Sequence, residues 1–273
     1  MKKILFSIAA SLFLSGCSSL LYYPTQMEYY QIKDLPYQIE EMKFPDSSGH
    51  QIHAWYFHAQ NPKAKILFFH GNAQNLTAHF LMLAWLVDNN YDLMIFDYPG
   101  YGKSTGSPTP ESTVKSGVST LEKMSTIKPD LPLFVYGQSL GGQIMQKSLH
   151  LYDKKNYRAV FIEASFTSYR SVARSVAAKN WATWILQPIA WLLMNDSWAS
   201  DPGFISPTPV YVMHGDRDEV VGIEQGQHVF QKANEPKHWK VFAGGAHSNS
   251  YFIKNNFYRQ YLLESLDAEL KKK

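Results

Sequence analysis

A serine in a glycine-flanked turn is the residue of this sequence best placed to act as a nucleophile. Residues 137–141 read Gly-Gln-Ser-Leu-Gly, with Ser139 at the centre. The string follows an apolar run at 131–136 and precedes a helical pattern at 142–152. Glycines on both sides of a serine let a strand and a helix approach closely, so the turn exposes the hydroxyl. We therefore predict that Ser139 is a catalytic nucleophile, beside which the helix dipole favours negative charge.

A serine hydroxyl needs a base, and the base needs a carboxylate that orients it. Two carboxylates follow the apolar run at 209–214, in the string His-Gly-Asp-Arg-Asp at 214–218. Asp218 is the predicted acid, and Asp216 is the alternative. Both lie where a strand is expected to end, which is the edge of the sheet that Ser139 shares.

Three histidines follow these carboxylates. His247 lies in a loop directly after the last expected strand, so it can reach back to Ser139. His228 falls within an expected helix and His238 precedes a strand, positions typical of surface or packing side chains. We predict that His247 is the general base.

Attack on a carbonyl also needs hydrogen-bond donors for the oxyanion. The backbone N–H of Leu140, the residue after the nucleophile, is one predicted donor. The other is the backbone N–H of Asn72, which follows the apolar run at 64–70. Gly71 allows a tight turn there, and we expect the side chain of His70 to pack beneath this loop.

The string Gly-Lys-Ser at 102–104 is the one competing motif, because it resembles the end of a phosphate-binding loop. That loop requires a glycine five positions before Gly102 and a helix immediately after it. The residue there is Asp97, and Gly106, Pro108 and Pro110 prevent a continuous helix. The segment is therefore predicted to be an ordinary loop after a strand.

Apolar patterns alternate between strand and helix along most of the chain. This alternation predicts an α/β fold with a mostly parallel sheet covered by helices on both faces. The expected strands are 51–59, 64–70, 91–97, 131–136, 158–164, 209–214 and 238–244, and the expected helices are 76–88 (with Asn75 as N-cap), 111–127, 142–152, 224–232 and 249–270.

Residues 165–208 interrupt this alternation between two expected strands. They contain four of the seven tryptophans of the chain. We interpret the segment as an aromatic cap inserted over the carboxyl edge of the sheet; a long crossover helix is the alternative.

Together the motifs resemble those of the α/β-hydrolase superfamily, in its small serine-hydrolase branch. The resemblance rests on residues 70–73, 97–104, 137–142, 214–218 and 247, in that order, and covers about residues 40–270. It favours Asp218 over Asp216, because the acid of the superfamily usually stands four residues after the histidine of the His-Gly turn.

The resemblance implies cleavage of acyl esters or thioesters by a Ser139-His247-Asp218 triad, which requires no cofactor. The expected partner is a small-molecule or lipid-like acyl substrate. Two alternatives remain: a serine aminopeptidase with the same triad, and a non-catalytic hydrolase-like module of the cell envelope that binds lipid or a partner.

The N-terminus has the pattern of a secretory signal, with Lys2 and Lys3 before an apolar stretch at 4–14. The stretch ends in Leu-Ser-Gly-Cys, which resembles the lipobox of bacterial lipoproteins and places Cys17, the only cysteine, at the lipidation site. The predicted organisation is a signal peptide at 1–16, a lipidated Cys17 with a stalk at 17–36, and a hydrolase domain at 37–273. In Gram-negative bacteria this resemblance, with Ser18 in place of an aspartate after the cysteine, implies sorting of the lipoprotein to the outer membrane of the cell envelope, facing the periplasm. A plain signal peptide with a buried thiol is the alternative.

Composition is that of an ordinary globular enzyme, with 45% hydrophobic and 18% charged residues among 273. A net charge of +3 without a basic stripe argues against nucleic acid as a partner. The sequence contains neither H-E-x-x-H nor C-x-x-C, so no metal site is expected.

Overall fold

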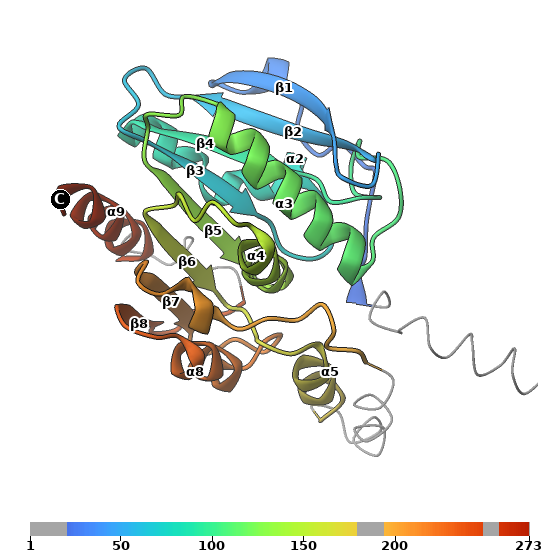
Figure 1. Cartoon of the computed structure of the whole chain (residues 1–273), viewed down its shortest axis with the longest axis vertical. Coiled ribbons are helices and arrows are strands. Elements are labelled where there is room, and N and C mark those ends of the chain that lie inside the picture. The colour runs from blue at the N-terminus through green and yellow to red at the C-terminus, as the bar shows by residue number, and fades with distance from the viewer. Residues whose placement is uncertain (1–20, 179–193, 248–256, 273) are drawn as a thin grey trace, which may run out of the picture.

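The computed structural model of the chain describes residues 21–178, 194–247 and 257–272. Eight strands form one sheet in the order β1-β2-β4-β3-β5-β6-β7-β8 (Figure 1). Their bounds are β1 (Gln38–Pro45), β2 (Gln51–His58), β3 (Ala64–Phe69), β4 (Tyr91–Phe96), β5 (Leu133–Gln138), β6 (Ala159–Glu163), β7 (Val210–Gly215) and β8 (Lys237–Phe242).

The strands from β3 to β8 run parallel, whereas β2 pairs antiparallel with β4, and β1 antiparallel with β2. Every residue of β3, β4, β5, β6 and β7 is buried, as their continuous apolar runs predicted. The seven expected strands are all present, which confirms the α/β-hydrolase fold. The eighth, β1, lies at the edge, where a mostly exposed strand carries little apolar pattern.

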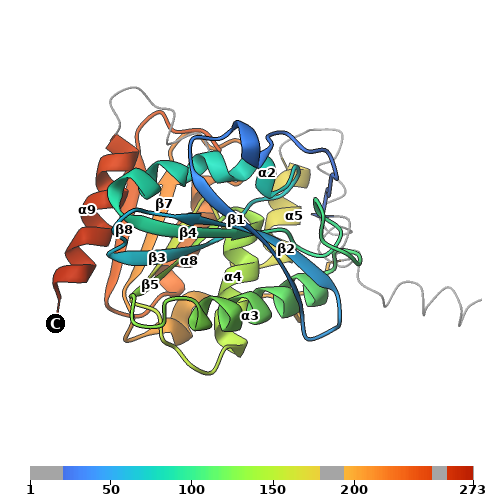
Figure 2. The ribbon, with the colours of Figure 1, turned by 90° about the horizontal axis from the view of Figure 1, so that it is seen from above.

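Helices cover both faces of this sheet (Figure 2). On one face α3 (Pro110–Thr126), α4 (Leu140–Leu151) and α8 (Ile223–Lys232) bury side chains in a shared apolar cluster. On the other face the α2 region and α9 (Phe257–Lys271) contribute to a second cluster. The remaining described helices are η2 (Ile32–Asp34), α5 (Tyr169–Ala178) and η5 (Pro202–Ile205).

The helix expected at 76–88 is divided into three short pieces. These are α2 (Leu76–His79) and two 3₁₀ helices, η3 (Phe80–Met82) and η4 (Ala84–Asn89). The expected N-cap is present, because the Asn75 side chain accepts a hydrogen bond from the Thr77 N–H. The spacing of Leu76, Phe80, Leu83 and Val87 is that of an amphipathic α-helix, and Phe80, Leu83 and Leu86 also fit the period of a 3₁₀ helix. The apolar pattern is therefore compatible with both helix types.

No helix begins directly after Gly102 in the loop that follows β4, as predicted. The next helix, α3, begins only at Pro110, where Thr109 forms the N-cap. Asp97 is fully buried at the start of this loop and accepts a hydrogen bond from the Leu76 N–H, at 2.7 Å. Further along the loop, the Lys103 ammonium forms an ion pair with the Glu41 carboxylate of β1, with 2.8 Å between Nζ and Oε1. The segment is thus part of the scaffold and does not present a phosphate-binding helix.

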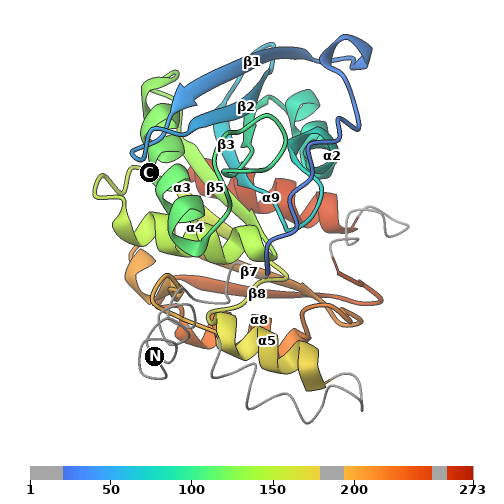
Figure 3. The same ribbon diagram turned by 90° about the vertical axis from the view of Figure 1, so that its right-hand side faces the viewer.

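Residues 21–36 do not extend away from the domain as the expected stalk would. Tyr22 is only 5% exposed, and its neighbours lie on the domain beside the carboxyl ends of the strands. Figure 3 shows this part of the chain, in blue, running beside α2 toward β1. The stalk interpretation is wrong for these residues because a buried tyrosine and backbone hydrogen bonds fix them to the domain. Residues 1–20, with the predicted signal peptide and Cys17, lie outside the described residues.

Of the expected cap, the structure describes residues 165–178 and 194–208. The Asp196 carboxylate accepts hydrogen bonds from the Ser168 hydroxyl, at 2.8 Å, and from the Arg170 N–H, at 3.2 Å, so it binds the start of α5. Trp198 packs against the apolar cluster below. Residues 179–193, with the other three tryptophans of this segment, lie outside the described residues, and the cap stays a prediction. Within the described ranges, no helix has the length and apolar character needed to span a bilayer.

Candidate active site

Ser139 occupies a sharp turn between β5 and α4. Its backbone angles are φ 54° and ψ −123°, a strained conformation for a residue other than glycine. The flanking glycines are required by contact: a Cβ on Gly137 would lie 2.7 Å from the Cα of Gly142, and one on Gly141 would lie 2.2 Å from the carbonyl oxygens of Phe69 and His70. The turn therefore has the geometry that the Gly-x-Ser-x-Gly string predicted.

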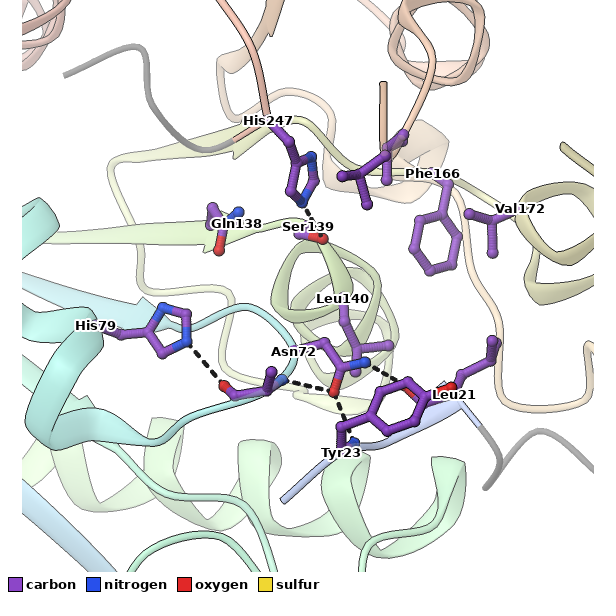
Figure 4. A pocket seen from close by; sticks show the side chains of 13 residues that line it. Leu21, Tyr23, Asn72, His79, Gln138, Ser139, Leu140, Phe166, Val172 and His247 are labelled. Atoms are coloured by element: carbon purple, nitrogen blue, oxygen red, sulfur yellow. Dashed lines mark hydrogen bonds between the residues drawn. The ribbon is translucent and has the colours of Figure 1, made fainter. Parts of the chain in front are cut away.

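Three predicted residues meet at this turn. His247 Nε2 lies 3.0 Å from Ser139 Oγ, and His247 Nδ1 lies 2.8 Å from Asp218 Oδ2. Figure 4 shows the imidazole of His247 pointing at the serine hydroxyl. Ser139 and Asp218 are 7% and 8% exposed. A carboxylate on Nδ1 fixes the tautomer that leaves Nε2 free to accept the serine proton.

Asp218 stays ionised in spite of its burial. Burial raises the pKa of this carboxyl, but contacts with His214 and His247 and the N–H of Val221 outweigh that effect and hold the pKa well below its usual range. Its other oxygen accepts hydrogen bonds from the N–H groups of Val220 and Val221, at 2.9 and 2.8 Å. The side chain is thus a rigid anion that points at His247.

His214 is a neighbour of the site that the sequence interpretation left without a role. It is fully buried, its Nε2 donates to the Val221 carbonyl at 2.8 Å, and the same atom lies 3.4 Å from Asp218 Oδ2. The four-residue spacing of His214 and Asp218 could have predicted their contact. That spacing brings the two side chains together only when a tight turn follows the strand.

The structure does not bring the alternative residues to Ser139. Asp216 is exposed and accepts a hydrogen bond from the Gly244 N–H, at 2.7 Å. His228 is exposed on α8, and His238 stacks on Tyr211 with ring centroids 4.3 Å apart. These are the surface and packing positions that the sequence predicted for the two histidines.

A pocket of about 490 Å³ opens above Ser139. Its lining is mostly apolar and consists of Leu21, Tyr23, Asn72, Ala73, His79, Gln138, Ser139, Leu140, Phe166, Val172, Val220, Val221 and His247. Both predicted oxyanion donors thus lie on this pocket. Leu140 is the first residue of α4, where a backbone N–H has no acceptor within the helix. Among the residues that the structure describes, no cluster of three potential metal ligands exists.

His79 adds a neutral ring to this lining. Burial and the neighbouring His70 lower the pKa of His79 to about 3, and its Nε2 hydrogen-bonds to the Ala73 carbonyl at 3.0 Å. His70 is fully buried under the loop, as expected, and stacks on Tyr98 at 4.5 Å and on His79 at 4.9 Å. None of the lining residues within the described part of the chain is a carboxylate, so these residues present no anionic group to a ligand.

Comparison with known proteins assigns the family. A family model described as serine aminopeptidase, S33, matches residues 60–206. The chain belongs to this family. It is 27% identical to the uncharacterized protein YfhR of Salmonella typhi, a match that covers 99% of this chain and 95% of that protein. It is 26% identical to the human alpha/beta hydrolase domain-containing protein 17B, over 79% of this chain and 70% of that protein.

Solved structures support the fold. The Pyrococcus furiosus esterase Pf2001 superposes with a TM-score of 0.72, over 92% of this chain and 98% of the esterase, at 15% identity. A thermostable carboxyl esterase from Bacillus coagulans gives a TM-score of 0.62, over 84% of this chain and 97% of that one, at 13% identity. At such identities the similarity concerns the fold alone.

Proposed function

We propose that this chain is a serine hydrolase that cleaves carboxylic esters or thioesters, with Ser139 as nucleophile, His247 as base and Asp218 as the orienting acid. The observation that carries the proposal is the pair of contacts of His247, 3.0 Å to Ser139 Oγ and 2.8 Å to Asp218. The esterases among the structural neighbours agree with this reaction class.

The reaction begins when Ser139 Oγ attacks the acyl carbon and its proton passes to His247 Nε2. The N–H groups of Leu140 and Asn72 donate to the resulting oxyanion. Collapse of this intermediate breaks the bond to the alcohol or thiol, which leaves with the proton from His247. Water then attacks the acyl-Ser139 ester with the same base, releases the carboxylic acid and restores the serine.

The lining of the pocket favours an ester substrate over a peptide with a free amino terminus. An aminopeptidase must bind an α-ammonium group, and a buried cation needs a carboxylate or comparable partner. The described residues of the pocket lining include no Asp or Glu, whereas their aliphatic and aromatic side chains suit a small-molecule or lipid-like acyl group. Faster cleavage of amino-acid nitroanilides than of nitrophenyl esters would contradict this choice.

Labelling with a tagged fluorophosphonate tests the nucleophile. The probe is applied to the purified chain from residue 18 onward and to its Ser139→Ala variant. Labelling of the unmodified protein alone is expected, because the reagent requires an activated serine. Absence of labelling in both proteins would favour the alternative of a non-catalytic binding module in the cell envelope.

The proposal extends to location. A diacylglyceryl group on Cys17 would anchor the mature chain in the bacterial cell envelope, at the outer membrane facing the periplasm. The support is the sequence alone: the basic and apolar residues before Cys17, and Ser18 after it. More than one acyl chain is needed for stable anchoring, as this modification supplies. Replacement Cys17→Ser is expected to release the protein from the membrane fraction; unchanged fractionation would rule the anchor out.

A further inference from the structure

Residues 21–29, called here the N-terminal segment, lie against the loop that carries Asn72. This Asn72 loop, residues 70–75, connects β3 to α2. Figure 4 shows Leu21 and Tyr23 next to Asn72 and Leu140, within the same pocket as Ser139. A segment that precedes the hydrolase domain in the sequence therefore supplies part of the pocket wall.

The Asn72 side chain is the main link between the two. Its Nδ2 donates to the Leu21 carbonyl, and its Oδ1 accepts from the Tyr23 N–H at 2.9 Å. The same Oδ1 accepts from the Tyr101 hydroxyl and from the Ala73 N–H, both at 2.8 Å. One amide thus joins the N-terminal segment, the Asn72 loop and the loop after β4.

Further hydrogen bonds continue along the segment. Asn75 Nδ2 donates to the carbonyls of Thr25, at 3.0 Å, and Met27, at 2.7 Å. The Tyr29 N–H donates to Thr77 Oγ1 at 3.0 Å. Backbone groups of the segment therefore pair with side chains along residues 72–77.

Tyr22 fixes the other side of the segment. Its hydroxyl lies 3.3 Å from Thr113 Oγ1 on α3 and 3.1 Å from the Tyr169 hydroxyl on α5. The ring is buried in the apolar cluster that also contains Leu140. The N-terminal segment is thus bound to fixed helices on one side and to the Asn72 loop on the other.

The Asn72 loop needs outside support because its own backbone is strained. Ala73 and Gln74 have φ values of 58° and 55°, which cost residues other than glycine about 1 kcal/mol or more each. The helix that follows has only four residues, so it adds little local stability. The contacts with the N-terminal segment therefore select this conformation.

We propose that the N-terminal segment is a positioning element of the catalytic site, which holds the Asn72 loop so that the Asn72 N–H faces the oxyanion. The inference rests on the proposed function, since it assigns a role within that reaction. The acceptors on the segment are backbone carbonyls, so the recognising side chains are those of Asn72 and Asn75. Asn72 acts through its backbone N–H on the substrate and through its side chain on the segment.

The test compares Asn72→Ala with Asn89→Ala in the full-length chain, purified in detergent. Asn72→Ala retains the backbone N–H but removes the bonds to Leu21 and Tyr23. The matched control removes one hydrogen bond from Asn89 Nδ2 to the Trp85 carbonyl, in η4 and outside the pocket lining. Both kcat and KM are measured with a short-chain nitrophenyl ester, together with circular dichroism.

We expect Asn72→Ala to lower kcat by about 10²-fold, the effect of losing one oxyanion donor, with KM changed less than about threefold. Asn89→Ala should retain the kcat of the unmodified chain. A kcat of Asn72→Ala equal to that of the unmodified chain would overturn the positioning role. An unmodified chain that neither turns over the ester nor reacts with fluorophosphonate would instead refute the proposed function.

A milder variant keeps the test decisive if Asn72→Ala does not fold. Tyr101→Phe preserves the buried ring and removes only the hydroxyl, which donates to Asn72 Oδ1 and also contacts the Tyr23 backbone of the segment. A smaller drop in kcat, about threefold to tenfold, at constant KM is expected. An unchanged kcat in folded Tyr101→Phe would count against the proposal in that case.

Discussion

The two loops on either side of Ser139 are held in place by different means. The turn at 137–142 is fixed by steric contacts, because its glycines lie against each other and against the end of β3, the strand beside β5 in the sheet. The Asn72 loop is fixed by a segment that lies earlier in the chain. Asn72 forms hydrogen bonds with Leu21 and Tyr23, which precede it by 51 and 49 residues. A short glycine motif marks the first loop and its steric contacts, whereas the second depends on hydrogen bonds to a segment that no motif marks.

This difference predicts how each loop responds to mutation. Larger side chains at its glycines should damage the serine turn, because no space exists there for a Cβ atom. Loss of hydrogen bonds should damage the Asn72 loop, where strained residues depend on a distant segment. Asp218, the proposed acid, lies outside both loops and provides the reference for the largest effect on activity.

Replacement Asp218→Asn should have that largest effect. The amide cannot hold His247 in the tautomer that leaves Nε2 unprotonated, so we expect kcat for a nitrophenyl ester to fall by about 10⁴-fold. The matched control is Asp216→Asn, since Asp216 is exposed and its carboxylate accepts from the Gly244 N–H. Equal losses in the two variants would contradict the assignment of the acid.

Replacement Gly141→Ala should break the serine turn sterically. Its Cβ would lie 2.2 Å from two carbonyl oxygens of the β3 end, so the backbone must move. We expect the free energy of unfolding in urea to fall by about 1–3 kcal/mol or more, together with loss of fluorophosphonate labelling. In the control Gly222→Ala the new Cβ meets only the carboxylate end of Glu224, a flexible group, and stability should change by less than about 1 kcal/mol. Equal stabilities of the two variants would contradict the steric account.

Replacement Asn75→Ala should loosen the Asn72 loop. It removes an N-cap and also the two bonds to Thr25 and Met27. We expect a loss of about 2 kcal/mol in the free energy of unfolding, measured in urea. Thr109→Ala is the control, because it removes the N-cap of α3 without contacting the N-terminal segment. If Thr109→Ala costs as much, the bonds from Asn75 to the segment contribute no stability.

The smallest expected effect at neutral pH concerns His79, whose contribution to stability changes only below pH 6.5. Its pKa in the folded chain, about 3, lies below the ordinary 6.5, so the unfolded chain binds more protons between these values. The stability that depends on neutral His79 is therefore complete above pH 6.5 and is lost as the pH falls toward 3. His79→Gln should reduce the slope of unfolding free energy against pH, in urea at pH 4.5–6.5, by up to about 1.4 kcal/mol per pH unit. An unchanged slope would show that His79 is protonated in the folded chain.

The sequence predicted those parts of the molecule that depend on neighbouring residues. The strands, the Ser139 turn, Asp218 and His247 follow from apolar runs and short motifs whose meaning is local. The prediction of one helix at 76–88 failed because the buried residues there fit the periods of both helix types, so apolar spacing could not separate one α-helix from shorter pieces. The prediction of a stalk failed for a different reason. Residues 21–29 pair mainly through backbone carbonyls and N–H groups, which every sequence has and which no sequence pattern can reveal.

The packing of Leu21 against the pocket also limits the geometry of any anchor. Only four peptide units separate Cys17 from Leu21, and an extended chain covers about 14 Å over that span. A lipid on Cys17 would therefore keep Leu21, on the wall of the pocket, within about 14 Å of the bilayer surface. This distance is close to the thickness of one leaflet, which is half of the ~30 Å hydrocarbon core. With such an anchor, the enzyme could meet an acyl ester before the acyl chain had fully left the membrane.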